Sequence, residues 1–383
     1  MGEASIVYFP VGNGDTSLIK LVDGTSILID SNITKDALDE ENEERYDVYS
    51  FLYKELRKQM GIRHLDAFIL THADDDHCRG IGEICYFGDP EKYSDEDKKN
   101  GLVVIDELWF TPRLFLTEEA GKSECAKLLK KEAERRMSLY KSGKTERDEP
   151  GNRIRIIGFT ENKDLKGLED IVTVPGNELN IINGNEKDDF RFFIYAPVKK
   201  DIDDDSGERN DSSVILQARF DIDGEKNACI AFFGGDAGCP IWEKVIDKNE
   251  QDNLEWDLFL APHHCSWYFF SEEASDSDAN PSEKIMSLLD MKREGAWVIA
   301  SSKPIKDDDD NPPHYRAAEI YEDKVGKDKF LCTSEYPNEQ SPQPIIFLMS
   351  EKGPVKDEFN EDQKSSVHAA VKSVLSTPRT YGC

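Results

Sequence analysis

The sequence predicts an α/β fold in which helices cover β-sheets, and three stretches lead to this expectation. Short strand-like runs separated by turn residues fill residues 4–30, and a helical pattern followed by an apolar run fills residues 46–71. Strand patterns return over residues 190–236. The order strand, helix, strand, loop is typical of an α/β sandwich. With 383 residues, the chain is long enough for a sizeable core or for one large domain with insertions.

The N-terminal part contains three predicted strands and one predicted helix. The strand runs are SIVYFPV, TSLIKLV and TSILID, and the turn signals GNGD and DG separate them. Residues 46–60 place apolar side chains at helical spacing. The apolar run LDAFILT, residues 65–71, follows the helix and is typical of a buried strand.

Residues 88–189 differ from the rest because they are charged and less periodic. They contain one predicted helix, at 125–144, and we expect the stretch to be a large insertion in the main fold. Further strands are predicted at 190–196, 212–220, 228–236, 256–264, 296–302 and 344–349, with a helix at about 315–325. These patterns predict one domain over residues 1–352 and a polar C-terminal tail over residues 353–383.

The charge balance argues against binding of polyanions by bulk electrostatics. The chain has 48 Lys and Arg residues against 78 Asp and Glu, which gives a formal charge of −30. A nucleic-acid substrate then requires a local basic patch, a metal-bearing cleft or a basic partner. The densest basic charge lies in the predicted helix at 125–144, on Lys127, Lys130, Lys131, Arg135 and Arg136. These residues form either a solvated face with Glu partners or a positive wall beside a cleft.

Cysteine usage and hydropathy predict a cytoplasmic protein without a membrane anchor. The eight cysteines are scattered singly and form no CxxC pair, which is typical of a reducing compartment. No stretch approaches the run of about 20 apolar residues that a spanning helix needs. The N-terminus lacks the basic segment of a signal peptide and begins directly with a strand pattern.

Residues that bind hard metal ions occur where predicted strands end. Asp30 ends the third strand, and the segment HADDDH, residues 72–77, follows the apolar run at 65–71. Asp236 ends the strand FFGGD, and His263 and His264 end the strand LFLAPHH. Each residue alone is explained by a turn, a helix cap or the surface. Because the carboxyl ends of strands in α/β folds form sites together, the four occurrences predict a metal centre.

The order of these motifs resembles the metallo-β-lactamase fold, an αββα sandwich. Within that fold the sequence is similar to the soluble nuclease-like domain of the competence protein ComEC. That family begins with a GQGD turn, has the metal motif H-x-D-x-D-H, and contains a PHHGS segment. Here the turn is GNGD, the motif is His72 to His77, and the last segment is PHHCS, with Cys265 in place of glycine. The resemblance does not cover residues 88–189 or the tail.

The resemblance implies a role for each motif residue in a centre of two divalent ions. His72 and Asp74 serve one metal, and Asp76 and His77 serve the other. Asp236 bridges the two, and either His263 or His264 completes the second site. Asp75 points away from the pair. A carboxylate in place of an imidazole moves metal preference from zinc towards manganese or magnesium, so we expect manganese or zinc, with magnesium as a further candidate.

Supporting residues are predicted from the same comparison. Asp30 orients the histidine turn, and Asp211 lies in the NDSSVIL segment, which matches the strand at the usual third-histidine position. The segment NPPHYRAAEIY resembles the family's GHP segment and predicts His314 as a catalytic residue that protonates the leaving oxygen. Asp76 is the second predicted catalytic residue.

Three functional hypotheses follow from these motifs. The first is a metal-dependent phosphodiesterase or nuclease that acts on DNA, alone or with a partner protein, through a water molecule activated by two metals. The second is a hydrolase of a small anionic substrate, such as a small phosphodiester, a nucleotide, a lactone or a thioester. The third is a metal-bearing subunit that binds a partner and has no catalytic activity. The intact ligand set argues against the third, the net charge favours the second, and the H-x-D-x-D-H motif favours the first.

Overall fold

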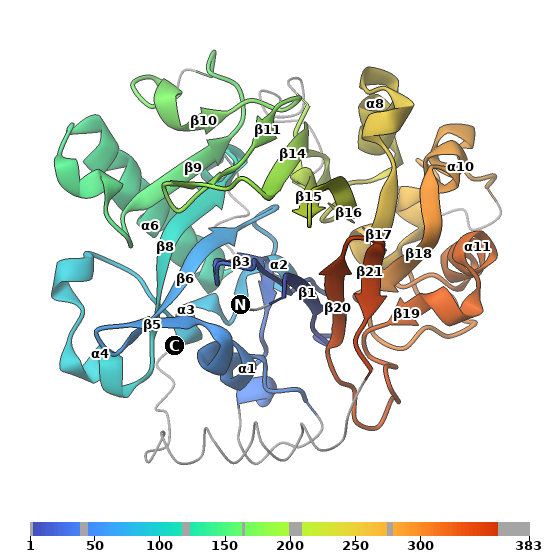
Figure 1. Cartoon of the computed structure of the whole chain (residues 1–383), viewed down its shortest axis with the longest axis horizontal. Coiled ribbons are helices and arrows are strands. Elements are labelled where there is room, and N and C mark those ends of the chain that lie inside the picture. Colours follow the sequence, from blue (N-terminus) through green and yellow to red (C-terminus); the bar gives the residue numbers. More distant parts are fainter. Residues whose placement is uncertain are drawn as a thin grey trace.

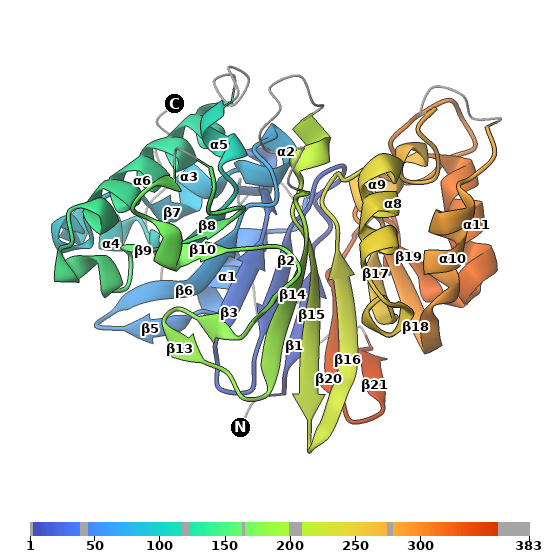
Figure 2. The same cartoon turned by 90° about the horizontal axis from the view of Figure 1, so that it is seen from above.

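The structure is a computed structural model that describes residues 3–38, 45–116, 123–162, 165–198, 209–273 and 279–358. Two β-sheets lie face to face in the middle, and helices cover the outer face of each sheet (Figure 1, Figure 2). This arrangement of four layers confirms the predicted α/β sandwich class.

The first sheet has the strand order β10-β9-β8-β6-β3-β2-β1-β20-β21, and outside this order β5 pairs with β6 and β7 pairs with β8. Its strands are β1 (Ser5–Tyr8), β2 (Ser17–Lys20), β3 (Ser26–Ile29), β5 (Arg57–Gln59), β6 (Ile62–Ile69), β7 (Cys85–Tyr86), β8 (Val103–Phe110), β9 (Arg153–Ile157), β10 (Val172–Thr173), β20 (Ile345–Ser350) and β21 (Gly353–Lys356). Strands β3, β6, β8 and β9 are parallel, whereas β2 is antiparallel to both β1 and β3. The carboxyl ends of β1, β3 and β6 therefore lie at one edge of the sheet.

The second sheet has the strand order β11-β14-β15-β16-β17-β18-β19. Its strands are β11 (Glu178–Leu179), β14 (Phe190–Ala196), β15 (Ile215–Ile222), β16 (Glu225–Phe233), β17 (Trp256–Leu260), β18 (Lys292–Ala300) and β19 (Phe330–Cys332). Strands β16 to β19 are parallel, so their carboxyl ends also share an edge. The short strand β4 (Ser31–Asn32) and the hairpin β12 (Ile181–Ile182) and β13 (Asn185–Glu186) complete the strands that are described.

Helices α1 (Val48–Glu55), α2 (Asp75–Cys78), α3 (Ile81–Ile84), α4 (Asp95–Lys99), α5 (Arg113–Leu116) and α6 (Glu124–Lys141) lie on the side of the first sheet. Helices α8 (Cys239–Lys248), α9 (Pro262–Cys265), α10 (Glu283–Asp290) and α11 (Tyr315–Val325) lie on the side of the second. The two short helices α2 and α9 are at the same end of the sandwich (Figure 2).

Apolar side chains fill the space between the layers. Ile29 of the first sheet and Leu216 and Phe233 of the second belong to one buried cluster between the sheets. Leu52 and Leu129 belong to a second cluster, between the first sheet and its helices. A third cluster contains aromatic rings between the second sheet and its helices. Burial of this apolar area is the main force that fixes the strand ends around the site.

The charged stretch 88–189, which we expected to be an insertion, is joined to the core. All eight residues of β8 are buried, and β8 pairs in parallel with β6. Strand β9 in turn pairs with β8, and α6 covers the sheet. The stretch thus contributes strands to the first sheet, and its interpretation as an insertion in the main fold stays a prediction. The sequence pattern hides this contribution in part because some charged groups, such as Arg136 and Glu132, are paired inside the protein.

The C-terminal part departs from the expected boundary by a few residues. Strand β21 lies at Gly353–Lys356, within the range predicted as a polar tail, and pairs with β20. The remainder of the predicted tail, residues 359–383, lies outside the described residues. None of the helices in the described ranges is long and apolar enough to cross a membrane.

Candidate metal centre

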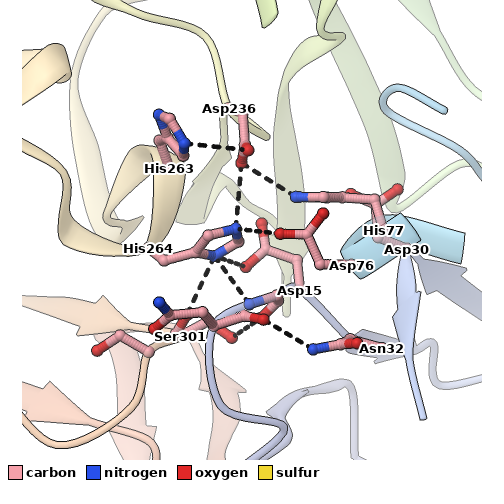
Figure 3. A network of polar contacts seen from close by, with 12 residues as sticks. Asp15, Asp30, Asn32, Asp76, His77, Asp236, His263, His264 and Ser301 are labelled. Carbon is pink, nitrogen blue, oxygen red and sulfur yellow. Dashed lines mark hydrogen bonds and ion pairs between the residues drawn. The ribbon is translucent and has the colours of Figure 1, made fainter. Parts of the chain in front are cut away.

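A buried cluster of histidines and aspartates lies where the turns after the strands of both sheets meet (Figure 3). His72 and His77 follow β6, Asp236 follows β16, and His263 and His264 follow β17. The structure therefore brings together side chains that the sequence places at three separate strand ends. These side chains are at most 5% exposed, apart from His263.

Asp236 is the centre of the cluster, because each of its carboxylate oxygens faces two histidines. Its Oδ1 lies 3.0 Å from Nε2 of His77 and 3.4 Å from Nε2 of His264. Its Oδ2 lies 3.6 Å from Nε2 of His72 and 3.5 Å from Nε2 of His263. A carboxylate that faces one pair of imidazoles with each oxygen has the arrangement required to bridge two cations.

The donor atoms of this cluster fit cations better than they fit one another. Nε2 of His72, His77 and His264 and Oδ1 of Asp236 are buried and form no hydrogen bond with any described group. The 3.0 Å contact between His77 and Asp236 lacks hydrogen-bond geometry. A buried polar atom without a partner costs about 1–3 kcal/mol. Several buried nitrogen and oxygen donors that face one point without hydrogen bonds are the arrangement expected of a site for divalent metal ions.

The charges of the metal-free cluster are strongly coupled. Burial alone would raise the pKa of Asp236, but the facing histidines, His77 and His264 above all, hold it well below its usual range. Burial alone would lower the pKa of His77, but Asp236 and Asp30 raise it well above its usual value. Burial alone would also lower the pKa of His264, but the facing carboxylates, Asp236 above all, raise it to about 10. For His263 the effect of burial is the largest, and the pKa is lowered. Protons on the imidazoles thus balance the carboxylates until metal binding displaces them.

The backbone is strained where it carries the two adjacent histidines. His263, His264 and Cys265 have φ values of 50°, 54° and 67°, in the left-handed region that costs other residues than glycine about 1–3 kcal/mol each. The ComEC-like motif has glycine where Cys265 stands, and the structure shows why glycine suits this position. In this left-handed conformation the imidazoles of His263 and His264 face Asp236 from two directions (Figure 3).

Glycine is also required just before the shared carboxylate. Gly235 has a φ of 49°, and a Cβ at this residue would lie 2.9 Å from Oγ1 of Thr71. The amide of His263 donates to the carbonyl oxygen of Gly235, at 3.0 Å. The absence of a side chain therefore lets the turns after β6, β16 and β17 approach one another.

Asp30 lies behind His77 and holds it in place, as the motif predicts for a supporting residue. Its Oδ2 is 2.7 Å from Nδ1 of His77, and its two oxygens accept hydrogen bonds from the amide and hydroxyl of Thr71. With its proton on Nδ1, His77 presents the lone pair of Nε2 to the cluster.

The three aspartates of the HADDDH segment occupy different environments. Asp76 approaches the cluster, with Oδ2 3.3 Å from Nε2 of His264, and its side chain is 32% exposed. Asp75 forms an ion pair with Arg79 and accepts a hydrogen bond from Ser123. Asp74 is the N-cap residue of α2 and lines a cavity of about 570 Å³ together with Asp75 and Arg79. The assignment of Asp74 as a ligand stays a prediction.

The two remaining predicted residues are not joined to the cluster by any described contact. The ring of His314 packs against Trp267, at a centroid distance of 5.4 Å, and its amide donates to the carbonyl oxygen of Cys265. Its role as a proton donor stays a prediction. Asp211 lies in a short 3₁₀ helix, Arg209–Ser212, but its side chain is outside what the structure describes.

The basic residues of α6 are largely committed to contacts within the protein. Arg136 is 1% exposed, pairs with Glu132 and donates to the carbonyl oxygen of Ile105. Arg135 pairs with the same glutamate. Lys127 pairs with Glu124, three residues earlier on the helix, as expected if these residues form a solvated face with Glu partners. The arginines therefore do not form a positive wall for a substrate.

Asp15 is the residue of the cluster that we did not predict as a site residue. Its carboxylate is 4% exposed, and Oδ1 lies 3.5 Å from Nδ1 of His264. It belongs to the turn GNGD, which the sequence comparison used only as a family signature. An aspartate after a glycine is so common in turns that its burial beside a histidine could not be read from the sequence.

One comparison with known proteins is consistent with this fold. The sequence profile of the metallo-β-lactamase superfamily matches residues 9–116, which include Asp30 and the HADDDH segment but not Asp236 or His263. The α/β sandwich is consistent with a metallo-β-lactamase fold. No curated protein matches the chain.

A solved structure from Parabacteroides distasonis ATCC 8503, which carries the provisional description of a metal-dependent hydrolase, is 11% identical to this chain. The comparison covers 85% of this chain and 90% of that one, with a TM-score of 0.32. A likeness at this level carries no information about shared chemistry.

Proposed function

We propose that this protein is a metal-dependent phosphodiesterase whose reaction takes place at Asp236. The supporting observation is that each oxygen of this buried carboxylate faces its own pair of imidazoles. Two bound cations would lower the pKa of a water molecule and polarise the phosphoryl group of a substrate.

The residues divide into two groups around the shared carboxylate. His72 and His263 face Oδ2 and would hold one cation. His77 and His264 face Oδ1, with Asp76 beside His264, and would hold the other. Asp30 would keep His77 in the tautomer that binds metal.

The exposed members of the cluster indicate where a substrate would enter. The side chains of Asp76 and His263 are 32% and 22% exposed, whereas those of His72, His77 and His264 are buried. A phosphodiester group would therefore approach over Asp76 and His263. The buried imidazoles would remain shielded from water, which strengthens their electrostatic interactions.

DNA is the substrate class that the ComEC-like H-x-D-x-D-H motif favours, and we propose cleavage of DNA in the cytoplasm. The net charge of −30 opposes DNA binding, and α6 offers few unpaired basic groups. A basic partner protein would supply the missing positive charge. The same observations favour a second candidate, a small anionic substrate such as a nucleotide, another small phosphodiester, a lactone or a thioester.

A substrate panel tests the proposal and separates the two candidates. Metal-free protein is incubated with plasmid DNA, single-stranded DNA, RNA and bis-p-nitrophenyl phosphate, each with manganese, magnesium or zinc. Metal-dependent cleavage of DNA supports the first candidate, and cleavage of the small diester alone supports the second. Bound metal without hydrolysis of any phosphodiester would contradict the proposed activity and leave a lactonase, a thioesterase or a partner-binding subunit.

A further inference from the structure

We propose that Asp15 is itself a metal ligand, so that Asp15, His77, Asp236 and His264 form one oxygen-rich cation position. This inference rests on the metal centre proposed above. It adds a carboxylate that lies outside the histidine–aspartate motifs and makes the two cation positions chemically unequal.

The first support is the spacing of the donor atoms. One ligand atom from each of Asp15, His77, Asp236 and His264 lies within 4.8 Å of the others, and all four residues are buried. Ligands at about 2.0–2.2 Å from a cation lie at most about 4.4 Å apart on opposite sides of it. A small inward movement of these side chains would therefore place all four around one ion.

The second support is the contrast between two buried aspartates. The oxygens of Asp30 accept hydrogen bonds from Thr71 and contact His77, so this carboxylate is satisfied. Oδ1 of Asp15 is equally buried but forms no hydrogen bond with any described group. A buried anionic oxygen that accepts no hydrogen bond and faces an imidazole only at 3.5 Å is unfavourable unless a cation or a proton meets it more closely. Asp15 therefore has the environment of a ligand, whereas Asp30 has that of a supporting residue.

Asp15 is also not needed to position His264, which is the other role that a carboxylate beside a metal-binding histidine can have. Nδ1 of His264 lies 3.1 Å from the carbonyl oxygen of Ser301 and 3.2 Å from the amide nitrogen of Gly14. The contact with Asp15, at 3.5 Å, is longer than both and lacks hydrogen-bond geometry. Nδ1 donates to Ser301 when it carries the proton and accepts from Gly14 when it does not. With Nε2 on a metal, Nδ1 carries the proton, so the carbonyl oxygen of Ser301 orients the ring.

The turn that carries Asp15 is held firmly on both sides. Asn32 donates to the carbonyl oxygens of Val11 and Asn13, and the hydroxyl of Ser301 donates to the carbonyl oxygen of Gly14. A Cβ at Gly14, whose φ is 144°, would lie 2.1 Å from Nδ2 of Asn32. The turn therefore requires glycine immediately before the aspartate, and this packing fixes the carboxylate next to the cluster (Figure 3).

The donor sets predict different metal preferences at the two positions. The position with Asp15 has two carboxylates and two imidazoles, and the exposed Asp76 lies beside it. The other position has His72, His263 and the second oxygen of Asp236. Oxygen-rich sets favour manganese and magnesium, whereas imidazole-rich sets favour zinc, so the Asp15 position should prefer manganese.

Calorimetric titration of metal-free protein with manganese tests the assignment without an activity assay. We expect two binding events in the unchanged protein. The substitution Asp15→Asn should weaken one event by about 10-fold or more and leave the other unchanged. Asp75→Asn is the matched control, because Asp75 belongs to the same motif region but pairs with Arg79, and its binding should equal that of the unchanged protein. Equal affinity in Asp15→Asn and the unchanged protein would overturn the inference.

A second measurement does not depend on the folding of a variant. Anomalous diffraction from manganese-loaded crystals of the unchanged protein should place an ion in direct coordination with a carboxylate oxygen of Asp15. An ion in the cluster without contact to Asp15 would overturn this inference but leave the proposed function intact. Protein that binds no divalent cation would overturn both. Protein that binds the ion at Asp15 but hydrolyses no phosphodiester would uphold the ligand and overturn the function.

Discussion

Oδ2 of Asp30 lies 2.7 Å from Nδ1 of His77, and both side chains are fully buried. The carboxylate and the imidazole come from the turns after β3 and β6, which pair in parallel, so the sheet itself sets their distance. The contact determines which nitrogen of His77 carries the proton and which one is offered to a metal.

The first prediction concerns this contact. In Asp30→Asn, an amide NH₂ group replaces one of the two carboxylate oxygens. If this NH₂ group faces Nδ1 of His77, two donors meet there, so the tautomer with the proton on Nδ1 and a free Nε2 is no longer favoured. We expect metal affinity to fall about 10- to 100-fold, which is the usual effect of losing a partner behind a metal-binding histidine. Competition with a chelating dye measures the affinity, and far-ultraviolet circular dichroism verifies the fold. Unchanged affinity in a folded variant would show that Asp30 does not orient His77.

The second prediction concerns α6 and follows from the burial of Arg136. Arg136→Ala leaves Glu132 as a buried charge that only the half-buried Arg135 still contacts, and it removes the donor to the carbonyl oxygen of Ile105. The free energy of unfolding should fall by about 3–5 kcal/mol, which is typical for one partner of a buried ion pair.

Lys131→Ala is the control on the same helix, because this residue is exposed, and it should change stability by less than about 0.5 kcal/mol. Urea unfolding of both variants measures the difference. Similar stability of the two variants would mean that the Arg136–Glu132 pair does not anchor the helix.

The contrast between α6 and the strand ends explains what the sequence could predict. The apolar runs of β3, β6, β16 and β17 are short and are followed by aspartate or histidine residues, so both the strands and most of the cluster could be predicted. Within the stretch 88–189 the helix α6 was predicted, but the strands β8 and β9 were not. The burial of the helix was hidden too, because Arg136 and Glu132 look solvated in a hydropathy pattern although they neutralise each other in the interior. A charged sequence can thus form a central part of a sheet sandwich.

Asp15 shows a second limit of the sequence. Its turn meets His264 only in the folded chain, and the contact between Gly14 and His264 joins residues 250 positions apart. No local spacing encodes such a contact. The same holds for His314, whose motif resembles the family segment but whose ring packs against Trp267.

The third prediction is a pH dependence of stability that arises away from the metal centre. Burial raises the pKa of Asp257 to about 6, against the opposing effects of Arg293 and the amide of Ile230. The carboxyl group of an unfolded chain has a pKa near 3.9, so between about pH 4 and pH 6 the folded state retains a proton that the unfolded state has lost. The contribution of Asp257 to stability is therefore present below pH 4 and is lost as the pH rises through 6.

Asp257→Asn should remove this dependence, because the amide can still accept the hydrogen bond from Ile230 but does not titrate. Relative to the unchanged protein, the variant should become more stable as the pH rises from 4 to 7, by up to about 2–3 kcal/mol. Urea unfolding at several pH values measures the difference between the two proteins. A difference that is the same at pH 4.5 and pH 7 would contradict the raised pKa.

The last prediction concerns the carboxylate that the two histidine pairs share. Asp236→Asn removes one negative charge from both proposed cation positions, and an amide cannot bridge two metals through two anionic oxygens. Catalysis should fall by about 10²-fold or more, because the group that holds both cations supplies several kcal/mol of transition-state stabilisation. The fold should persist, because asparagine has nearly the same shape as aspartate. In addition, the C-terminal half of β16, the strand before it, is buried in the apolar cluster between the sheets.

A purely structural role for Asp236 predicts a different result. Asp236 lies two residues before Gly238, which is the N-cap of α8 and has no side-chain cap. Since asparagine supports a helix start about as well as aspartate, a residue that served only this helix start would tolerate the change with stability and activity both preserved. Thermal melting without added metal, metal titration and cleavage of bis-p-nitrophenyl phosphate on one preparation separate the two roles. We expect a folded protein with impaired metal binding and little activity. Full activity in a well-folded Asp236→Asn protein would exclude a centre in which this carboxylate bridges two metals.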